Sequence, residues 1–136
     1  MRNRNVKNIL IVDDCPNDQK LITMLLQRSF DCNIHTVDSM MIAKVKLFTE
    51  KFDIITLDGH LPCPITGGYG HKLIPWIKEH QNSECEIIMI SGERSYIITG
   101  IELGAHGGIN KSDIKEKMEL HQKLNKQFDF VPVEMV

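Results

Sequence analysis

The sequence lacks the features that mark a membrane protein or a secreted one. Its longest purely aliphatic runs, residues 9–12 and 87–90, are far shorter than the ~20 apolar residues of a membrane-spanning helix. The positively charged start is followed by four apolar residues before Asp13, which is too few for the core of a signal peptide. We therefore expect a cytoplasmic protein that neither spans nor binds a membrane.

An excess of charge of one sign and paired cysteines are also missing. Sixteen basic residues stand against 18 acidic ones, for a net charge of −2, whereas a nucleic-acid-binding chain usually shows a basic excess or stripe. The four cysteines are Cys15, Cys32, Cys63 and Cys85. They form no CxxC pair, so neither a zinc site nor a disulfide framework is indicated. We expect reduced thiols and no direct contact with nucleic acid.

What the sequence does contain is a regular alternation of strand-like and helix-like segments. The strand-like runs are residues 8–12, 33–37, 52–57, 86–90 and 107–110. Because each is followed by a helical pattern, and parallel strands need such long crossovers, the sequence predicts one parallel sheet covered on both faces. At 136 residues with 42% apolar content, this is the size and composition of a single doubly wound α/β domain.

Local signals indicate where several helices begin. Pro16 starts the first helix, and Ser39 can cap the second, in which Met41, Val45 and Phe48 recur at helical spacing. Pro75 fits only the first turn of a helix, so we expect the third helix to begin near residues 71–72. The fourth helix should run from 94 to 103 and stop at Gly104. A last helix is predicted over 112–127, with an inward stripe of Ile114, Met118, Leu124 and Phe128.

Polar residues follow the predicted strands at the edge where functional residues of such sheets collect. These residues are Asp13 and Asp14 after the first strand, Asp58 after the third, Ser91 after the fourth and Lys111 after the fifth. Carboxylates brought together raise one another's pKa values unless a cation joins them, and an all-oxygen site of this size suits Mg²⁺. Lys111 and Ser91 supply a cation and a hydroxyl for phosphoryl oxygens, and the Asp58 carboxylate can act as the nucleophile.

These residues resemble the receiver domain of bacterial two-component response regulators, the CheY-like family. The resemblance rests on ILIVDD, DIITLDGHLP, IIMISG and GAHGGINK, in that order along almost the whole chain. It implies a flavodoxin-like fold with strand order 2-1-3-4-5. It also implies that Asp58 is the phosphoacceptor, that Asp13, Asp14, Asp58 and the backbone carbonyl of His60 hold Mg²⁺, and that Ser91 and Lys111 contact the phosphoryl group.

The resemblance further implies a switch rather than an enzyme that acts on a separate substrate. A histidine kinase or histidine phosphotransfer protein would supply the phosphoryl group. A downstream protein would then bind the face formed by the fourth helix, fifth strand and fifth helix. We expect a monomer or weak dimer, with the receiver domain over residues 1–128 and a tail or linker start at 129–136.

Gly108 departs from the family pattern, because an aromatic residue usually stands three positions before the lysine. Ser112 also replaces the usual proline after Lys111. These departures keep open a receiver-like interaction module that no longer uses phosphorylation. An aspartyl-phosphate hydrolase of the haloacid dehalogenase type is disfavoured, because it needs an acid at the position of His60.

Overall fold

The computed structural model describes residues 6–61 and 68–114 as strands, helices and connecting turns. The strands are β1 (Lys7–Val12), β2 (Cys32–Val37), β3 (Ile54–Asp58), β4 (Glu86–Ser91) and β5 (Gly107–Asn110). The helices are α1 (Pro16–Ser29), α2 (Met40–Thr49), the 3-10 turn η1 (Gly70–Leu73), α3 (Ile74–His80) and α4 (Arg94–Glu102). Residues 111–114 are helical as well.

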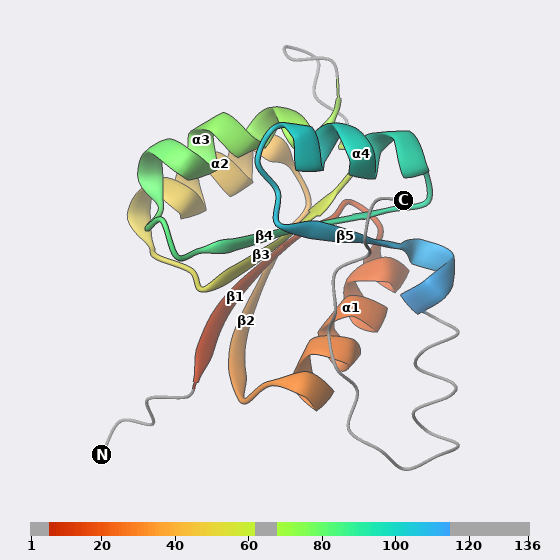
Figure 1. Cartoon of the computed structure of the whole chain (residues 1–136). Coiled ribbons are helices and arrows are strands. Elements are labelled where there is room, and N and C mark those ends of the chain that lie inside the picture. Colours follow the sequence, from red (N-terminus) through yellow and green to blue (C-terminus); the bar gives the residue numbers. More distant parts are fainter. Residues whose placement is uncertain (1–5, 62–67, 115–136) are drawn as a thin grey trace.

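The five strands form one parallel sheet in the order β2-β1-β3-β4-β5. α2, α3 and α4 cover one face of this sheet and α1 covers the other (Figure 1). The doubly wound fold and its strand order, both expected from the sequence, are therefore confirmed. In such a sheet the carboxyl ends of all five strands lie at the same edge.

The sheet separates two hydrophobic clusters, which explains why the central strands are apolar on both faces. On β1, Leu10 and Val12 pack in the cluster beneath α2 and α3, whereas Ile9 and Ile11 pack in the cluster beneath α1. All five residues of β3 are buried. The central strands are thereby fixed, and so are the positions of the polar residues at their ends.

α1 begins at Pro16, as the sequence predicts, and it buries Ile22, Leu25 and Leu26. α2 is capped by Ser39, whose hydroxyl oxygen accepts a hydrogen bond from the backbone N–H of Ile42 at 3.2 Å. The cap is thus confirmed.

The apolar spacing that identified α2 does not mark its inner face. Its buried residues are Met40, Ala43 and Leu47. The three residues whose spacing predicted the helix are exposed, namely Met41, Val45 and Phe48. Helical periodicity identified the element, but both sides of this helix are apolar, and periodicity alone cannot say which side faces the core.

The third helix begins slightly later than expected. The 3-10 turn η1 occupies Gly70–Leu73, and α3 starts at Ile74 with Pro75 in its first turn. The placement of Pro75 is confirmed, because its missing N–H costs nothing at that position. Of the predicted last helix, Ile114 is buried in the cluster beneath α1, and residues 115–127 lie outside the described residues.

α4 packs unusually close to the sheet at two glycines. A Cβ atom on Gly100 would lie 2.4 Å from the Met89 side chain, and one on Gly108 would lie 2.4 Å from Cγ2 of Ile97. α4 ends as predicted, because Gly104 adopts a φ of +120° that other residues rarely take. The space beside Gly108 is therefore filled by Ile97 from α4.

Two absences expected from the sequence can be compared with the described residues. Cys15, Cys32 and Cys85 are free thiols, and Cys63 lies outside the described residues. No helix in the described part of the chain is long and apolar enough to cross a membrane.

Candidate functional site

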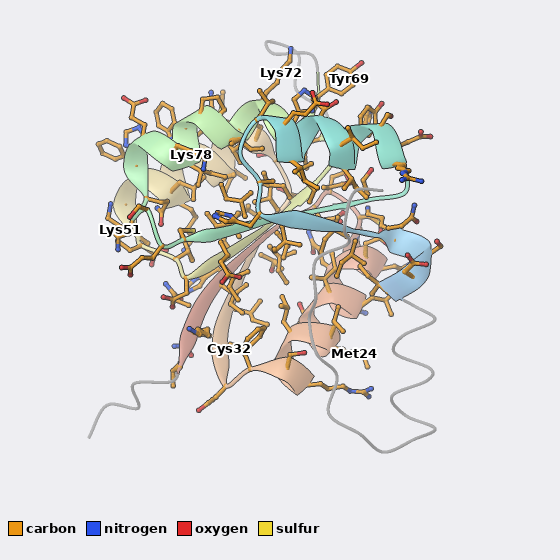
Figure 2. The ribbon with its side chains drawn as sticks, viewed as in Figure 1. Met24, Cys32, Lys51, Tyr69, Lys72 and Lys78 are labelled. Carbon is orange, nitrogen blue, oxygen red and sulfur yellow. The ribbon has the colours of Figure 1, made fainter. Side chains whose placement is uncertain are left out.

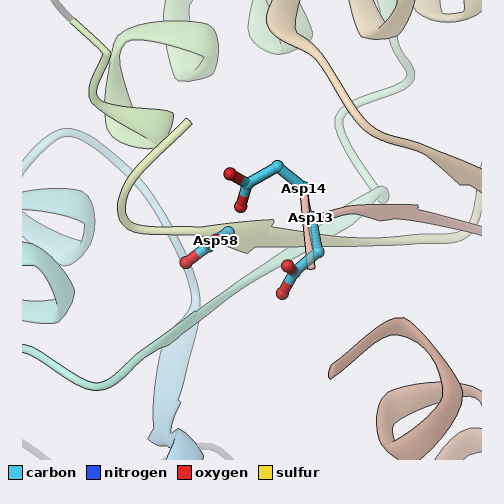
Figure 3. Close-up of side chains that lie close together, drawn as sticks. All are labelled: Asp13, Asp14 and Asp58. Carbon is cyan, nitrogen blue, oxygen red and sulfur yellow. The ribbon is translucent and has the colours of Figure 1, made fainter. Parts of the chain in front are cut away.

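Three carboxylates meet at the carboxyl edge of the two central strands. Asp13 and Asp14 follow β1, and Asp58 is the last residue of β3 (Figure 3). Each offers an oxygen, and these atoms all lie within 4.8 Å of one another. The sequence-based prediction that the strand ends would bring these three residues together is confirmed by their geometry.

The three carboxylates differ in burial and in hydrogen bonding. Asp13 is fully buried and Asp58 is 6% exposed, whereas Asp14 is exposed. The backbone N–H of Cys15 donates to Asp13 Oδ1 at 2.8 Å, and the backbone N–H of His60 approaches Asp58 Oδ1 at 3.4 Å. Two buried acids therefore stand beside one that water can reach.

Lys111 joins the acidic cluster from the end of β5. Its ammonium lies 3.1 Å from Asp13 Oδ2 and 3.3 Å from Asp58 Oδ1. It also contacts Asp18 Oδ2, in the first turn of α1, at 2.7 Å. The predicted lysine is thus in the site, and a further carboxylate, that of Asp18, also holds it.

The pKa of the Asp58 carboxyl lies near neutral pH. Burial raises its pKa to about 7, and the neighbouring charge of Asp13 adds to that rise, while Lys111 acts in the opposite direction. Burial also raises the pKa of Asp13, against the lowering effects of the Cys15 N–H and of Lys111. One lysine therefore does not fully compensate the two buried acids.

Lys111 itself stays charged. Burial lowers its pKa, but the hydrogen bond to Asp18 and the charges of Asp58 and Asp13 outweigh that effect and raise the pKa above its usual value. A permanent cation beside Asp58 is an arrangement that stabilises negative charge developing on transferred oxygens.

Ser91 ends β4 next to Asp58. It is 3% exposed, and its Oγ accepts a hydrogen bond from the Glu93 backbone N–H at 3.0 Å. A Cβ atom on Gly59, the residue after Asp58, would lie 2.6 Å from that Oγ and 2.8 Å from the Cβ of Tyr96. Gly59 is therefore packed between the hydroxyl and the first turn of α4.

Backbone packing also fixes the chain that leaves Asp58. A Cβ atom on Gly70 would lie 1.8 Å from the Asp58 carbonyl oxygen, so η1 approaches this carbonyl as closely as only glycine permits. The Gly70 N–H donates to the Gly59 carbonyl at 3.1 Å, and exposed His60 forms an antiparallel bridge with Tyr69. The backbone of residues 58–60 is thus held from two sides.

Two tyrosines meet above this segment. The rings of Tyr69 and Tyr96 are 5.5 Å apart, and the Tyr69 ring stacks on His71 at the same separation. Tyr69 directly precedes η1 and lies near α4 (Figure 2). The aromatic contact beside residues 58–60 therefore comes from Tyr69, directly before η1, and from Tyr96 of α4, and β5 contributes Gly108 instead of a ring.

The residues at this edge suit a hard divalent cation. All donors are carboxylate oxygens, Asp14 is open to water, and the buried pair keeps raised pKa values that an added cation would lower. Mg²⁺ typically binds one or two protein carboxylates and keeps several waters. The acidic triad is therefore able to hold a divalent metal.

Comparison with known proteins identifies the family to which the chain belongs. A family model described as the response regulator receiver domain matches residues 9–125. No relative is found among curated protein sequences. Because the match covers most of the chain, it extends beyond the individual motifs at the strand ends.

Solved structures share the fold at low sequence identity. A response regulator protein from Burkholderia pseudomallei, with a phosphorylated aspartic acid, a calcium ion and citrate, has a TM-score of 0.63 at 21% identity, over 88% of this chain and 75% of that one. The RcsB response regulator of Salmonella typhimurium gives 0.69 at 20% identity, over 91% of this chain and 63% of its own. This chain therefore spans less than two thirds of that regulator.

A third match is with a receiver domain alone. The beryllofluoride-activated receiver domain of DrrB, a regulator from Thermotoga maritima, gives a TM-score of 0.64 at 21% identity, over 87% of this chain and 98% of that domain.

Proposed function

We propose that this chain, which belongs to the response regulator receiver domain family, is a phosphorylation switch whose Asp58 accepts a phosphoryl group. The observation that carries the proposal is the buried Asp58 carboxylate, held beside a second acid and a permanent cation. In this step an Asp58 oxygen bonds to phosphorus, and the donor group leaves with the electron pair of the broken bond. Positioning and charge neutralisation supply most of the rate enhancement in such transfers.

Mg²⁺ would be held by Asp13, Asp14, Asp58 and the backbone carbonyl of His60. When bound, it supplies positive charge that favours the ionised form of Asp58 and neutralises phosphoryl oxygens. Asp13 supports this assignment, because its Oδ2 is buried and has an ion pair with Lys111 but no well-directed hydrogen bond within the described chain. A metal ion would complete the coordination of this oxygen.

Lys111 and Ser91 would contact the phosphoryl group itself. Lys111 already lies 3.3 Å from Asp58 Oδ1, and the buried Ser91 hydroxyl lies against Gly59. Both groups would stabilise the added oxygens by charge and hydrogen bonding. As the family implies, the donor is a histidine kinase or a histidine phosphotransfer protein. We assign residues 1–128 to the receiver and 129–136 to a tail or linker start.

The test is labelling with a small donor. Incubation with acetyl phosphate and Mg²⁺ should add one phosphoryl group, detected by mass spectrometry of the intact chain. The increment should disappear in Asp58→Ala and in the presence of a chelator. Asp38→Ala is the matched control, because Asp38 directly follows β2 and is exposed. Labelling that persists in Asp58→Ala would overturn the assignment.

A receiver-like interaction module without phosphorylation is the second candidate. It is favoured by Gly108, where Ile97 fills the space and β5 offers no ring to report phosphorylation. Complete failure of wild-type labelling, in a folded sample with Mg²⁺, would favour this module over the switch.

A further inference from the structure

α2 is apolar on both of its sides. Its inner side is buried through Met40, Ala43 and Leu47. Its outer side carries four largely exposed apolar side chains, called here the outer stripe: Met41 (65% exposed), Ile42 (49%), Val45 (61%) and Phe48 (67%). An apolar helix face is normally buried against another element. The outer stripe is therefore as apolar as a buried surface, but it is exposed to solvent.

The outer stripe differs from the other exposed apolar residues of the described chain. Met24, Tyr69 and Leu103 are exposed one at a time, on α1, before η1 and after α4. Single exposed apolar residues are normal on any protein, whereas a contiguous patch marks an interaction surface. The four side chains of the outer stripe follow helical spacing and thus form one such patch.

α3 braces one side of the outer stripe. The Phe48 ring meets the His80 ring at 5.4 Å, and His80 lies 4.2 Å from the ring of Trp76. The Trp76 indole N–H donates to the Lys44 carbonyl at 3.2 Å, which ties α3 to the backbone of α2. The patch therefore lies on α2, and α3 packs against α2 along one side of it.

Charges around the outer stripe are largely compensated. Lys46 forms an ion pair with Glu50 at 3.0 Å, and the Lys44 ammonium lies over the Trp76 ring at 5.3 Å, toward α3. Exposed Asp38 precedes the helix, and exposed Lys51 follows it. The two ends of α2 thus carry opposite charges, in the pattern that a copy of the same helix running the other way would match.

We propose that the outer stripe is the interface between two copies of this chain, with the two α2 helices antiparallel about a two-fold axis near Val45. In this arrangement Met41 of one protomer meets Phe48 of its partner, a sulfur–aromatic contact made twice. Asp38 of one protomer approaches Lys51 of its partner, and the helix dipoles oppose. A parallel pair would instead place like charges together.

The size of the surface sets the strength of the dimer. The exposed parts of the four side chains amount to roughly 400 Å² per copy, against about 800 Å² per partner in a stable interface. The dimer should therefore be weak and should form in a concentration-dependent way. It needs neither Asp58 nor a metal, so it is independent of the proposed phosphorylation.

Sedimentation velocity of the full chain tests the proposal. From about 1 μM to about 1 mM, the weight-average mass of the wild type should rise toward twice that of the monomer. Val45→Glu places two like charges at the axis and should remain monomeric over the whole range. Met24→Glu, on an exposed apolar residue of α1, is the matched control and should associate like the wild type. Circular dichroism checks that each variant is folded, and Phe48→Ser replaces Val45→Glu if that variant unfolds.

Charge exchange tests the antiparallel arrangement. Asp38→Lys should weaken association several-fold, and adding Lys51→Asp to the same chain should restore it. A wild type that stays monomeric throughout would overturn the proposal and leave the outer stripe to a different protein. Equal loss in Met24→Glu would overturn it as well, and failure of the double variant to recover would overturn the antiparallel arrangement. Loss of acetyl phosphate labelling at Asp58 would leave these outcomes unchanged.

Discussion

The acidic end of β1 and β3 and the surface between α4 and β5 are built in different ways. At the acidic end, Asp13, Asp58 and Lys111 are held by charge, with contacts of 3.1 and 3.3 Å from the ammonium to the two acids. Beneath α4, the contact is apolar packing, in which Ile97 fills the space over Gly108. The first region has the acidic triad and the lysine that the resemblance to receiver domains leads us to expect, whereas the second has a glycine where that resemblance implies a ring.

The difference follows from what each region has to do. A charged cluster works only with particular groups at particular positions, because a misplaced buried charge is costly. An apolar contact can be rebuilt from other side chains as long as the volume is filled. The charged groups can therefore keep their positions while the packing beneath α4 changes.

Removing the cation from the acidic end should produce the largest effect. Lys111→Met leaves two buried acids uncompensated, and we expect a loss of about 3 kcal/mol in the free energy of unfolding near neutral pH. Both acids have raised pKa values, so they become neutral as the pH falls, and the loss should shrink toward about pH 4. Urea denaturation at both pH values measures it.

Lys20→Met on the exposed surface of α1 is the control and should change stability little. A Lys111→Met chain as stable as the wild type at neutral pH would show that the ammonium does not hold the acidic end together.

Filling the glycine beneath α4 should have the next largest effect. A Cβ at Gly108 would lie 2.4 Å from Ile97 Cγ2 and 3.1 Å from the Met89 carbonyl oxygen, so Gly108→Ala should cost about 1–3 kcal/mol by overpacking. In an Ile97→Ala background the same change should cost less, because Cγ2 is gone. A double-mutant cycle from urea denaturation measures this coupling.

Labelling at Asp58 should be retained in Gly108→Ala, since the acidic end is untouched. Additive effects of the two substitutions would show that Ile97 does not fill the space over Gly108, and loss of labelling in Gly108→Ala would show that the two regions are not independent.

The acidic end could be predicted from the sequence because charged residues follow apolar runs, and a parallel sheet brings strand ends together. Asp18 was missed as a partner of Lys111, since its reach depends on how α1 sits on the sheet. The sequence also shows that Gly108 lacks a ring, but not that Ile97 takes its place, because that contact joins α4 to β5. Likewise, η1 depends on the close approach of Gly70 to the Asp58 carbonyl, which no local pattern reports.

Because the Asp58 carboxylate is buried, we expect a smaller, pH-dependent effect on the free energy of unfolding. Its pKa is about 7 in the folded chain, above the ordinary value of 3.8, so the folded state binds the proton more tightly and loses stability as the pH rises between these values. Without Mg²⁺, Asp58→Asn should therefore be more stable than the wild type near pH 8, by on the order of 1 kcal/mol. The gain should vanish near pH 4.

Thermal denaturation across this pH range measures the difference, with exposed Glu84→Gln as the control. A gain that is the same at every pH would point to packing rather than to the charge of Asp58.

The smallest effect concerns how a change at Asp58 reaches the surface. Phosphorylation shifts a two-state equilibrium only through contacts that differ between the states. Here Gly59 joins Asp58 to Ser91 and Tyr96, and the Tyr96 ring meets Tyr69. We therefore expect a signal from Asp58 to enter α4 through its first turn.

α4 is also suited to a local rearrangement. Gly100 lowers its intrinsic helix stability by up to ~1 kcal/mol relative to alanine. With Mg²⁺ and the phosphoryl mimic beryllofluoride, amide resonances from Ser91 to Gly104 should therefore shift more than those of Gly107–Asn110. Asp58→Ala under the same conditions is the control and should show no such shifts. Strong shifts confined to β5 and the residues after it, with α4 unchanged, would exclude this route. They would show that the signal passes through β5 although Gly108 provides no ring there.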